Sequence, residues 1–168
     1  MLKKNGGAMA KKILVYFFSC SNVTKNLAKL IADVTKGDLF EIRPAIPYTS
    51  ADLDWTDRDS RSSLEMKEHS SRPEILEILS NMADYDVVFV GFPSWWYVAP
   101  TIINTFLESY DFAGKTIIPF CTSGGSGVGQ TDEKLHVSCP DTVNWKPAKL
   151  LNRATKKDVE KWVSSLDI

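Results

Sequence analysis

The sequence predicts a doubly wound α/β domain in which helices cover both faces of a parallel sheet. Three short runs, at residues 13–18, 87–90 and 116–120, are apolar on both faces, as the central strands of such a sheet are. Between them lie segments whose apolar residues recur at helical spacing. The two patterns alternate about five times along the chain, and this alternation favours right-handed βαβ units.

Two weaker strands and four helices complete the predicted order. Residues 39–42 alternate enough to lie nearer an edge of the sheet, and a short last strand is expected within residues 141–145. The first helix follows Thr24, and the third begins at Pro100. We interpret their apolar stripes as faces that pack on the core.

The second and fourth helices are predicted from capping-box spacing as well as from periodicity. Ser71 and Glu74 stand at this spacing around Pro73, and Thr155 and Asp158 stand at it before the last apolar stripe. The second helix is expected to carry a stripe formed by Ile75, Leu76, Ile78, Leu79 and Met82.

The composition indicates a globular protein of the cytoplasm. With 168 residues, the chain is long enough for one sizeable core. Its 20 basic and 21 acidic residues leave a net charge of −1, which argues against a nucleic-acid or membrane partner. Three cysteines do not make a disulfide framework and favour a reducing compartment. No apolar run approaches the roughly 20 residues that span a bilayer.

The expected organisation is a flexible leader at residues 1–11 followed by one domain over residues 12–168. Within the domain, residues 44–72 form an irregular insert rich in Asp, Ser and Pro. A connection of this length is usually functional or disordered. The embedded Tyr48 and Trp55 favour an insert that packs, such as a flap, and it is also a candidate contact for a homodimer.

The loop between the first strand and the first helix has the composition of an anion-binding site. Free backbone N–H groups and the helix dipole point at one place there, and hydroxyl groups add uncharged donors. The absence of Lys and Arg suits a tightly held phosphate monoester. A simple N-cap cluster is the alternative interpretation, since Ser, Asn and Thr are favoured there. The candidate residues are Ser19, Cys20, Ser21, Asn22, Val23 and Thr24.

A loop with three adjacent aromatic residues follows the third strand. Consecutive side chains cannot all point into the core, so some of these rings are expected to be half-exposed and to cover a flat ligand. A hydrophobic interface patch is the alternative. The candidate residues are Pro93, Ser94, Trp95, Trp96, Tyr97 and Val98.

A glycine-rich loop follows the fourth strand. It has almost no side chains, so its backbone can approach a ligand closely and offer N–H donors. A flexible linker is the alternative. The candidate residues are Thr122, Ser123, Gly124, Gly125, Ser126 and Gly127.

All three loops lie at the carboxyl ends of predicted parallel strands, where open α/β sheets bind ligands. In the strand order 2-1-3-4-5, strands one and three flank the point at which the order reverses. A phosphate-binding loop, an aromatic wall and a glycine-rich wall then meet in one crevice. This combination indicates a flat ring system with a phosphate tail.

These residues resemble the flavodoxin-like branch of small bacterial flavoproteins. Residues 16–24 are similar to the flavodoxin phosphate loop, commonly written Ser/Thr-x-Ser/Thr-Gly-x-Thr, and residues 92–96, 106–116 and 119–127 match the same branch. The resemblance spans about residues 12–166. It implies a three-layer sandwich with a five-stranded parallel sheet in the order 2-1-3-4-5. It also implies bound FMN, with the phosphate on the first loop and the ring between the other two.

The chain departs from the flavodoxin pattern at two positions. Asn22 stands at the glycine of the phosphate loop, and Tyr97 stands where many relatives have glycine. Asn tolerates a left-handed backbone better than most residues, so the turn is expected to survive. Tyr97 adds one more ring beside the flavin.

Two functions follow from this resemblance. One is an oxidoreductase in which NAD(P)H reduces FMN and a quinone-like small acceptor reoxidises it, with Tyr97 as a candidate proton donor. The other is a flavodoxin-type electron carrier that docks to redox proteins. A carrier that docks by electrostatic steering benefits from a surface of predominantly one charge sign around the cofactor. The balanced charge of this chain does not suggest such a surface. Carriers also turn a backbone carbonyl toward the flavin on a flexible loop, and the bulky residues 94–97 make this harder. Both points favour two-electron chemistry.

Other reactive side chains have plainer interpretations. A helix N-terminus could lower the pKa of the Cys20 thiol, but the favoured interpretation is that only its backbone N–H matters. His69 and His136 stand alone, without cysteines at metal-binding spacing, so no metal site is predicted.

Overall fold

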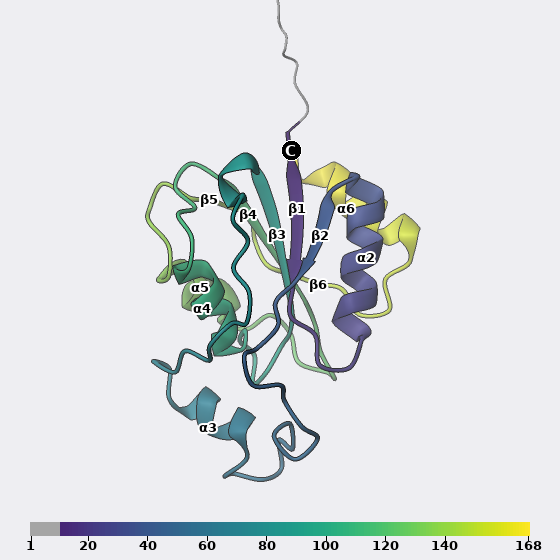
Figure 1. Ribbon diagram of the computed structural model, residues 1–168. Coiled ribbons are helices and arrows are strands. Elements are labelled where there is room, and N and C mark those ends of the chain that lie inside the picture. Colours follow the sequence, from purple (N-terminus) through teal and green to yellow (C-terminus); the bar gives the residue numbers. More distant parts are fainter. Residues whose placement is uncertain (1–10) are drawn as a thin grey trace, which may run out of the picture.

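A parallel sheet between two layers of helices forms the core of the computed structural model, which describes residues 11–168 (Figure 1). The strands run in the order β2-β1-β3-β4-β5, with β6 also paired to β4. This confirms the predicted fold class and strand order. The strands are β1 (Ile13–Phe17), β2 (Asp38–Glu41), β3 (Val87–Pro93), β4 (Thr116–Thr122), β5 (Asn144–Trp145) and β6 (Lys149–Leu150). The helices are α2 (Val23–Thr35), α3 (Arg61–Lys67), α4 (Thr101–Glu108), α5 (Thr131–His136) and α6 (Lys156–Ser165), with a 3-10 turn η1 (Met82–Asp84).

Alternate residues of the central strands build two separate cores. Helices α2 and α6 cover one face of the sheet, where Phe17 and Phe89 pack with Trp162 (Figure 1). Helices α4 and α5 cover the other face, where Tyr16 packs against Phe106. Burial on both faces explains why these strands carry apolar residues on both faces.

The helix predicted for residues 75–82 is wrong. Residues 71–80 run extended across the face that α4 and α5 cover, and only Met82–Asp84 makes a helical turn. Backbone bonds fix this segment: the Ala45 N–H donates to the Glu74 carbonyl at 2.8 Å, and the Leu76 N–H donates to the Arg43 carbonyl at 2.8 Å. Ser71, the expected cap, instead donates its hydroxyl to the Glu65 carbonyl at 2.8 Å.

The apolar spacing in this segment serves an extended chain equally well. Ile75 and Leu79 pack on the core, whereas Leu76 and Ile78 are exposed. The helices predicted after Thr24, Pro100 and Thr155 are confirmed, and Thr155 and Asp158 form the expected capping box.

The last sheet position is filled by two short strands instead of one. β5 pairs with the start of β4, and β6 pairs with its end. Between them lies Pro147, which has no N–H to give to the ladder, while the Ala148 N–H donates to the Asp132 carboxylate at 3.0 Å. The expected strand within residues 141–145 is therefore present as its last two residues, and β6 was not predicted.

The insert at residues 44–72 extends beyond the carboxyl edge of the sheet (Figure 1). It contains α3, which the irregular composition did not predict. Tyr48 packs edge-on against Phe18 and Trp95, so the expectation that the insert packs on the domain is confirmed. All but one residue of the predicted leader lie outside the described residues.

Residues 11–168 contain neither a membrane-spanning helix nor a cluster of metal ligands. Over this range no helix is long and apolar enough to cross a membrane. Nor does this part of the chain bring together three His, Cys, Asp or Glu residues that could hold a metal ion.

We predict that Gly91→Ala lowers the free energy of unfolding by about 1–3 kcal/mol, as overpacking a tight core does. Gly91 lies in β3 opposite Phe120 of β4, and a Cβ there would overlap the Phe120 ring. Urea unfolding of the FMN-free protein measures the change. Gly124→Ala is the control, because a Cβ at Gly124 meets no atom within 4 Å. Equal stability of the two variants would contradict the close contact.

Candidate functional site

The three candidate loops lie side by side because they follow adjacent strands. β1 pairs with β3, and β3 pairs with β4. Beyond the strands, the Ser94 N–H donates to the Thr122 carbonyl at 2.7 Å, which joins the aromatic and glycine-rich loops. The buried hydroxyls of Thr24 and Thr122 lie 2.9 Å apart and join the first loop to the third. The predicted meeting of the loops at the carboxyl edge is therefore observed.

The first loop presents a row of free backbone donors. Asn22 has φ 68°, the left-handed conformation expected at this position, and its carbonyl accepts from the Asn26 N–H at 2.9 Å. Within residues 11–168, no protein acceptor takes a hydrogen bond from the N–H groups of residues 19–24. Helix α2 begins at Val23 and points its positive end at the same place.

The N-cap interpretation of this loop applies only to Ser19. Its hydroxyl accepts from the Lys25 N–H at 3.2 Å, whereas the N-cap residue Asn22 makes no capping bond with its side chain. Ser19 is half-buried and Thr24 is buried. The other four residues, which are Cys20, Ser21, Asn22 and Val23, are exposed.

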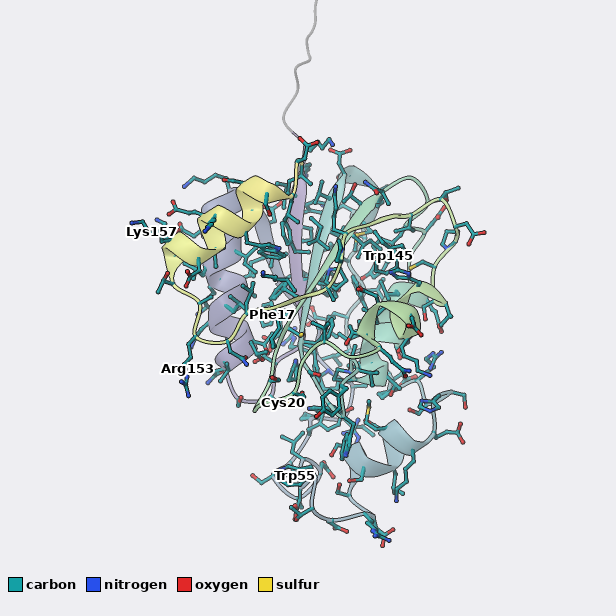
Figure 2. All side chains as sticks on the ribbon, turned by 180° about the vertical axis from the view of Figure 1, so that it is seen from behind. Phe17, Cys20, Trp55, Trp145, Arg153 and Lys157 are labelled. Atoms are coloured by element: carbon teal, nitrogen blue, oxygen red, sulfur yellow. The ribbon has the colours of Figure 1, made fainter. Side chains whose placement is uncertain are left out.

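The thiol of Cys20 is not activated by the helix end. Although the residue is exposed, desolvation of the thiol raises its pKa to about 12. The Arg61 guanidinium opposes this shift, and the Glu65 carboxylate adds to it. The thiol therefore stays protonated near neutral pH, in line with the interpretation that only the backbone of Cys20 matters. Figure 2 shows Cys20 at the edge of the domain, with Trp55 farther out on the insert.

The aromatic loop is a tight hairpin turn with an uncommon backbone. The Trp95 N–H donates to the Val98 carbonyl at 2.9 Å, and the Val98 N–H donates back to the Trp95 carbonyl at 3.2 Å. The two central residues, Trp96 and Tyr97, both have left-handed φ angles, of 51° and 66°. Such a type I′ turn normally carries Asn and Gly. Each bulky residue there costs about 1–2 kcal/mol.

The neighbouring glycine-rich segment supports this turn. Gly129 has φ 50°, and a Cβ on it would lie 2.5 Å from both the Cβ and the carbonyl oxygen of Tyr97. The Thr131 hydroxyl donates to the Val128 carbonyl at 2.6 Å and also lies 3.4 Å from the Tyr97 carbonyl oxygen. The backbone of Tyr97 is therefore held by close packing against Gly129, in a turn closed by the two bonds between Trp95 and Val98.

The glycine-rich loop is fixed at its base and open along its length. Asn152 accepts from the Ser123 N–H at 2.9 Å, and the Ser123 hydroxyl donates to the Ser126 carbonyl at 2.6 Å. A Cβ on Gly124, Gly125 or Gly127 would meet no protein atom within 4 Å. The loop therefore borders open space on the side of the site.

A cavity of about 560 Å³ lies between the aromatic loop and the glycine-rich loop. We call it the ring cavity; its size is within the usual range for a small-molecule site. The insert closes a third side, so the predicted loops and the insert share one space. Its walls are Leu53, Trp55, Ser62, Ser94, Trp95, Trp96, Tyr97, Gly124, Gly125 and Ser126.

Ser94 carries a polar group without a partner. Among residues 11–168, its hydroxyl oxygen is the one buried side-chain oxygen or nitrogen that forms no hydrogen bond. A buried polar group of this kind costs free energy unless a ligand or water satisfies it. Ser94 also lines the ring cavity, so a ligand bound there is a candidate partner for this hydroxyl.

A half-buried polar cluster joins the start of the insert to α3. The Tyr48 hydroxyl donates to Glu65 Oε1 at 2.5 Å, and Arg61 Nε donates to Glu65 Oε2 at 3.0 Å. The Arg61 guanidinium also lies over the Tyr48 ring, 3.8 Å from its centre. The loss of solvent and, after it, the hydrogen bond to Glu65 raise the pKa of Tyr48 well above its usual value. This cluster fixes α3 against the ring cavity.

The structure therefore brings some of the predicted residues together and leaves others apart. Residues 94–97 and 124–126 share the ring cavity, whereas Ser19 and Cys20 line a separate cavity of about 350 Å³ with Tyr48. Val98 lies in the wall of another cavity, beside α5. Sequence reasoning missed Leu53, Ser62 and Asn152, which carry no motif; only the aromatic residues of the insert pointed to its role.

Comparison with known proteins identifies the class that this fold and site define. A family profile described as flavodoxin matches residues 12–166. The chain therefore belongs to the flavodoxin family. A search among curated proteins returns no match.

Solved structures agree with this assignment. Two proteins provisionally described as flavoproteins are similar to the chain. The one from Bacteroides uniformis is 46% identical with a TM-score of 0.87, covering 92% of this chain and 99% of its own. The one from Bacteroides eggerthii is 45% identical with a TM-score of 0.90, covering 95% and 99%.

A more distant structure shares the fold. A flavoprotein from Lactobacillus acidophilus, solved in complex with FMN, is 23% identical with a TM-score of 0.68. The match covers 92% of this chain and 99% of that one.

Proposed function

We propose that the chain binds FMN and uses it as an oxidoreductase, with NAD(P)H as the electron donor and a quinone-like small molecule as the acceptor. Bound FMN would supply the chemistry of hydride transfer from the nicotinamide to the quinone, and the second proton that the quinone needs would come from solvent or the protein. The chain's own residues bind and orient the cofactor and limit its chemistry.

The binding residues suit both ends of FMN. The free N–H groups of residues 19–24 and the positive end of α2 would hold the phosphate without a charged side chain. The ring would lie in the ring cavity, between residues 94–97 and residues 124–126. There the unpartnered Ser94 hydroxyl would form a hydrogen bond with a polar atom of the ring system. The FMN complex of the Lactobacillus flavoprotein, which has the same fold, also supports this choice of cofactor.

The turn at residues 95–98 carries the proposal of two-electron chemistry. A carrier stabilises the half-reduced flavin by rotating a backbone peptide of this loop toward the ring. Here the central residues Trp96 and Tyr97 already hold left-handed conformations, with two hydrogen bonds across the turn. Because Gly129 packs closely against the Tyr97 backbone, rotation would break both this packing and the two hydrogen bonds across the turn.

Tyr97 is also placed to act on the acceptor. Its side chain lines the ring cavity, and the residue is 58% exposed. A phenol in this position can donate a proton to a quinone oxygen at the mouth of the cavity. The insert forms the opposite side through Trp55, so the acceptor would bind between the two.

The proposed function predicts turnover with little one-electron chemistry. The purified FMN form should oxidise NADH or NADPH faster when a quinone such as menadione is added, as steady-state absorbance would show. Photoreduction should give little of the long-wavelength band, near about 580 nm, of a half-reduced flavin. A large stable band together with no quinone-dependent turnover would instead identify an electron carrier.

Tyr97→Gly should increase the yield of half-reduced flavin, because glycine relieves the left-handed strain and frees the peptide to rotate. Tyr97→Phe is the matched control, since it keeps the Cβ and the strain and should leave that yield unchanged. The same control should lower kcat by about tenfold if the phenol donates the proton. Unaltered turnover would remove this role, and equal photoreduction spectra for both variants would refute the role of the turn.

Ser94→Ala should affect the FMN-free protein and FMN binding in opposite directions. Removing an unpartnered buried hydroxyl should raise the free energy of unfolding of the FMN-free protein by about 1 kcal/mol. Losing the bond to the ring should weaken FMN binding by about tenfold. Urea unfolding and flavin fluorescence titration measure the two effects.

Ser63→Ala is the control for the stability effect. The Ser63 hydroxyl is buried and donates to the Asp57 carbonyl at 2.7 Å, so its removal should lower the free energy of unfolding. A loss of stability in Ser94→Ala comparable to that in Ser63→Ala would show that the Ser94 hydroxyl is satisfied within the protein.

A further inference from the structure

A second cavity opens beside the ring cavity, between the insert and α5. Its volume is about 410 Å³, and it shares two walls, Trp55 and Trp96, with the ring cavity. None of residues 19–24 lines it. The proposed FMN phosphate site therefore makes no use of this space. We call it the side cavity.

The side cavity is lined by positive charge. Arg58 and Lys67 come from the insert and Lys134 comes from α5, while no Asp or Glu is among the lining residues. Lys67 Nζ donates to the Arg58 carbonyl at 2.8 Å, which leaves its charge uncompensated. Glu133 lines an adjoining cavity of about 370 Å³ that also touches Lys134.

Arg58 differs from most arginines of the chain, whereas Lys67 and Lys134 are like the other lysines, of which only Lys156 forms an ion pair within residues 11–168. Arg43, Arg61 and Arg72 each form an ion pair with a glutamate. Within the described range, neither Arg58 nor Lys134 forms an ion pair. Grouped cations without counter-ions repel one another, so their placement around one cavity favours an anionic ligand.

The boundary between the two cavities is aromatic. Trp55 is 73% exposed and Trp96 is 46% exposed, although large exposed indole rings are unfavourable in water. Trp96 is also held there by the strained turn. Two rings at the junction with the ring cavity are suited to stack on a flat ligand that passes from one cavity to the other.

We infer that the side cavity binds the acidic group of an aromatic anion whose ring lies on Trp55 and Trp96 beside the flavin. This inference rests on the proposed function and names the class of its substrate. A nicotinamide dinucleotide, through its phosphates, and a quinone that carries a sulfonate or carboxylate share this chemistry. In either case Arg58, Lys67 and Lys134 bind the acidic group and the tryptophans orient the ring.

Calorimetric titration of the FMN-loaded protein tests the inference with three probes. Anthraquinone sulfonate and NADP⁺ represent the two sources of an aromatic anion, and hydroxymethyl anthraquinone is a neutral probe with the same ring as the first. The variant is Arg58→Gln/Lys134→Gln. The control is Lys29→Gln/Lys157→Gln, which removes the same charge from exposed residues of α2 and α6; Figure 2 shows Lys157 far from the insert.

At least one anionic probe should bind the wild-type protein and lose about tenfold in affinity in the first double variant. That probe identifies the source. Its affinity should be unchanged in the control variant, and that of the neutral probe should change less than twofold. In the wild-type protein, added salt should weaken binding of the anion but not of the neutral probe, which tests the inference even if the variant folds poorly.

Failure of the inference is distinguishable from failure of the proposed function. The inference is overturned if neither anion binds the FMN-loaded protein, if both double variants lose affinity equally, or if the neutral probe loses as much as the anion. FMN content and NAD(P)H turnover are measured separately. Charge-dependent binding without turnover supports the inference and refutes the oxidoreductase. Turnover without charge-dependent binding supports the oxidoreductase and refutes the inference.

Discussion

Pairing of β3 with β1 and β4 is the constraint on which the site depends. The three strands are hydrogen-bonded along their lengths. Gly91 of β3 lies opposite Phe120 of β4 and leaves room for its ring. Because parallel strands end at one edge, this pairing delivers three separate loops to the same place. The Ser94–Thr122 backbone bond and the Thr24–Thr122 hydroxyl pair then carry the strand register into the loops.

The loops combine openness with rigidity. The first loop keeps its backbone N–H groups free, and the glycines of the third loop border open space, so both loops leave room for a ligand. The second loop is strained, because two bulky residues hold left-handed conformations. Gly129 and Thr131 contact the backbone of the second of them, Tyr97. Strain of this kind persists only where surrounding structure determines it, and it is concentrated at functional sites. In the proposed oxidoreductase, this strained backbone limits how the flavin is stabilised.

The insert adds a wall that the sheet alone lacks. Tyr48 packs on Phe18 and Trp95 of the domain, and a half-buried cluster joins it to Arg61 and Glu65 of α3 through hydrogen bonds and a stacked guanidinium. Farther along, the insert carries Trp55 and Arg58 to the mouth of the site. One segment thus joins the ring cavity to the side cavity, and in our proposals it supplies both the aromatic surface and the charge that select the substrate.

The sequence by itself determined the central strands, the helices after Thr24, Pro100 and Thr155, and the three loops. These features depend on local periodicity, caps and the placement of loops at strand ends, which the residues encode directly. The strand order was expected from the resemblance to flavodoxins. Only the tertiary structure decided that residues 71–80 are extended, because Ile75 and Leu79 pack equally well from either conformation and the bonds to Arg43 and Ala45 come from a distant segment. It also decided that Leu53, Ser62 and Asn152 reach the site and that Arg58 and Lys134 meet across a cavity. Such contacts join residues far apart in the chain, and no periodicity or motif within either segment specifies them.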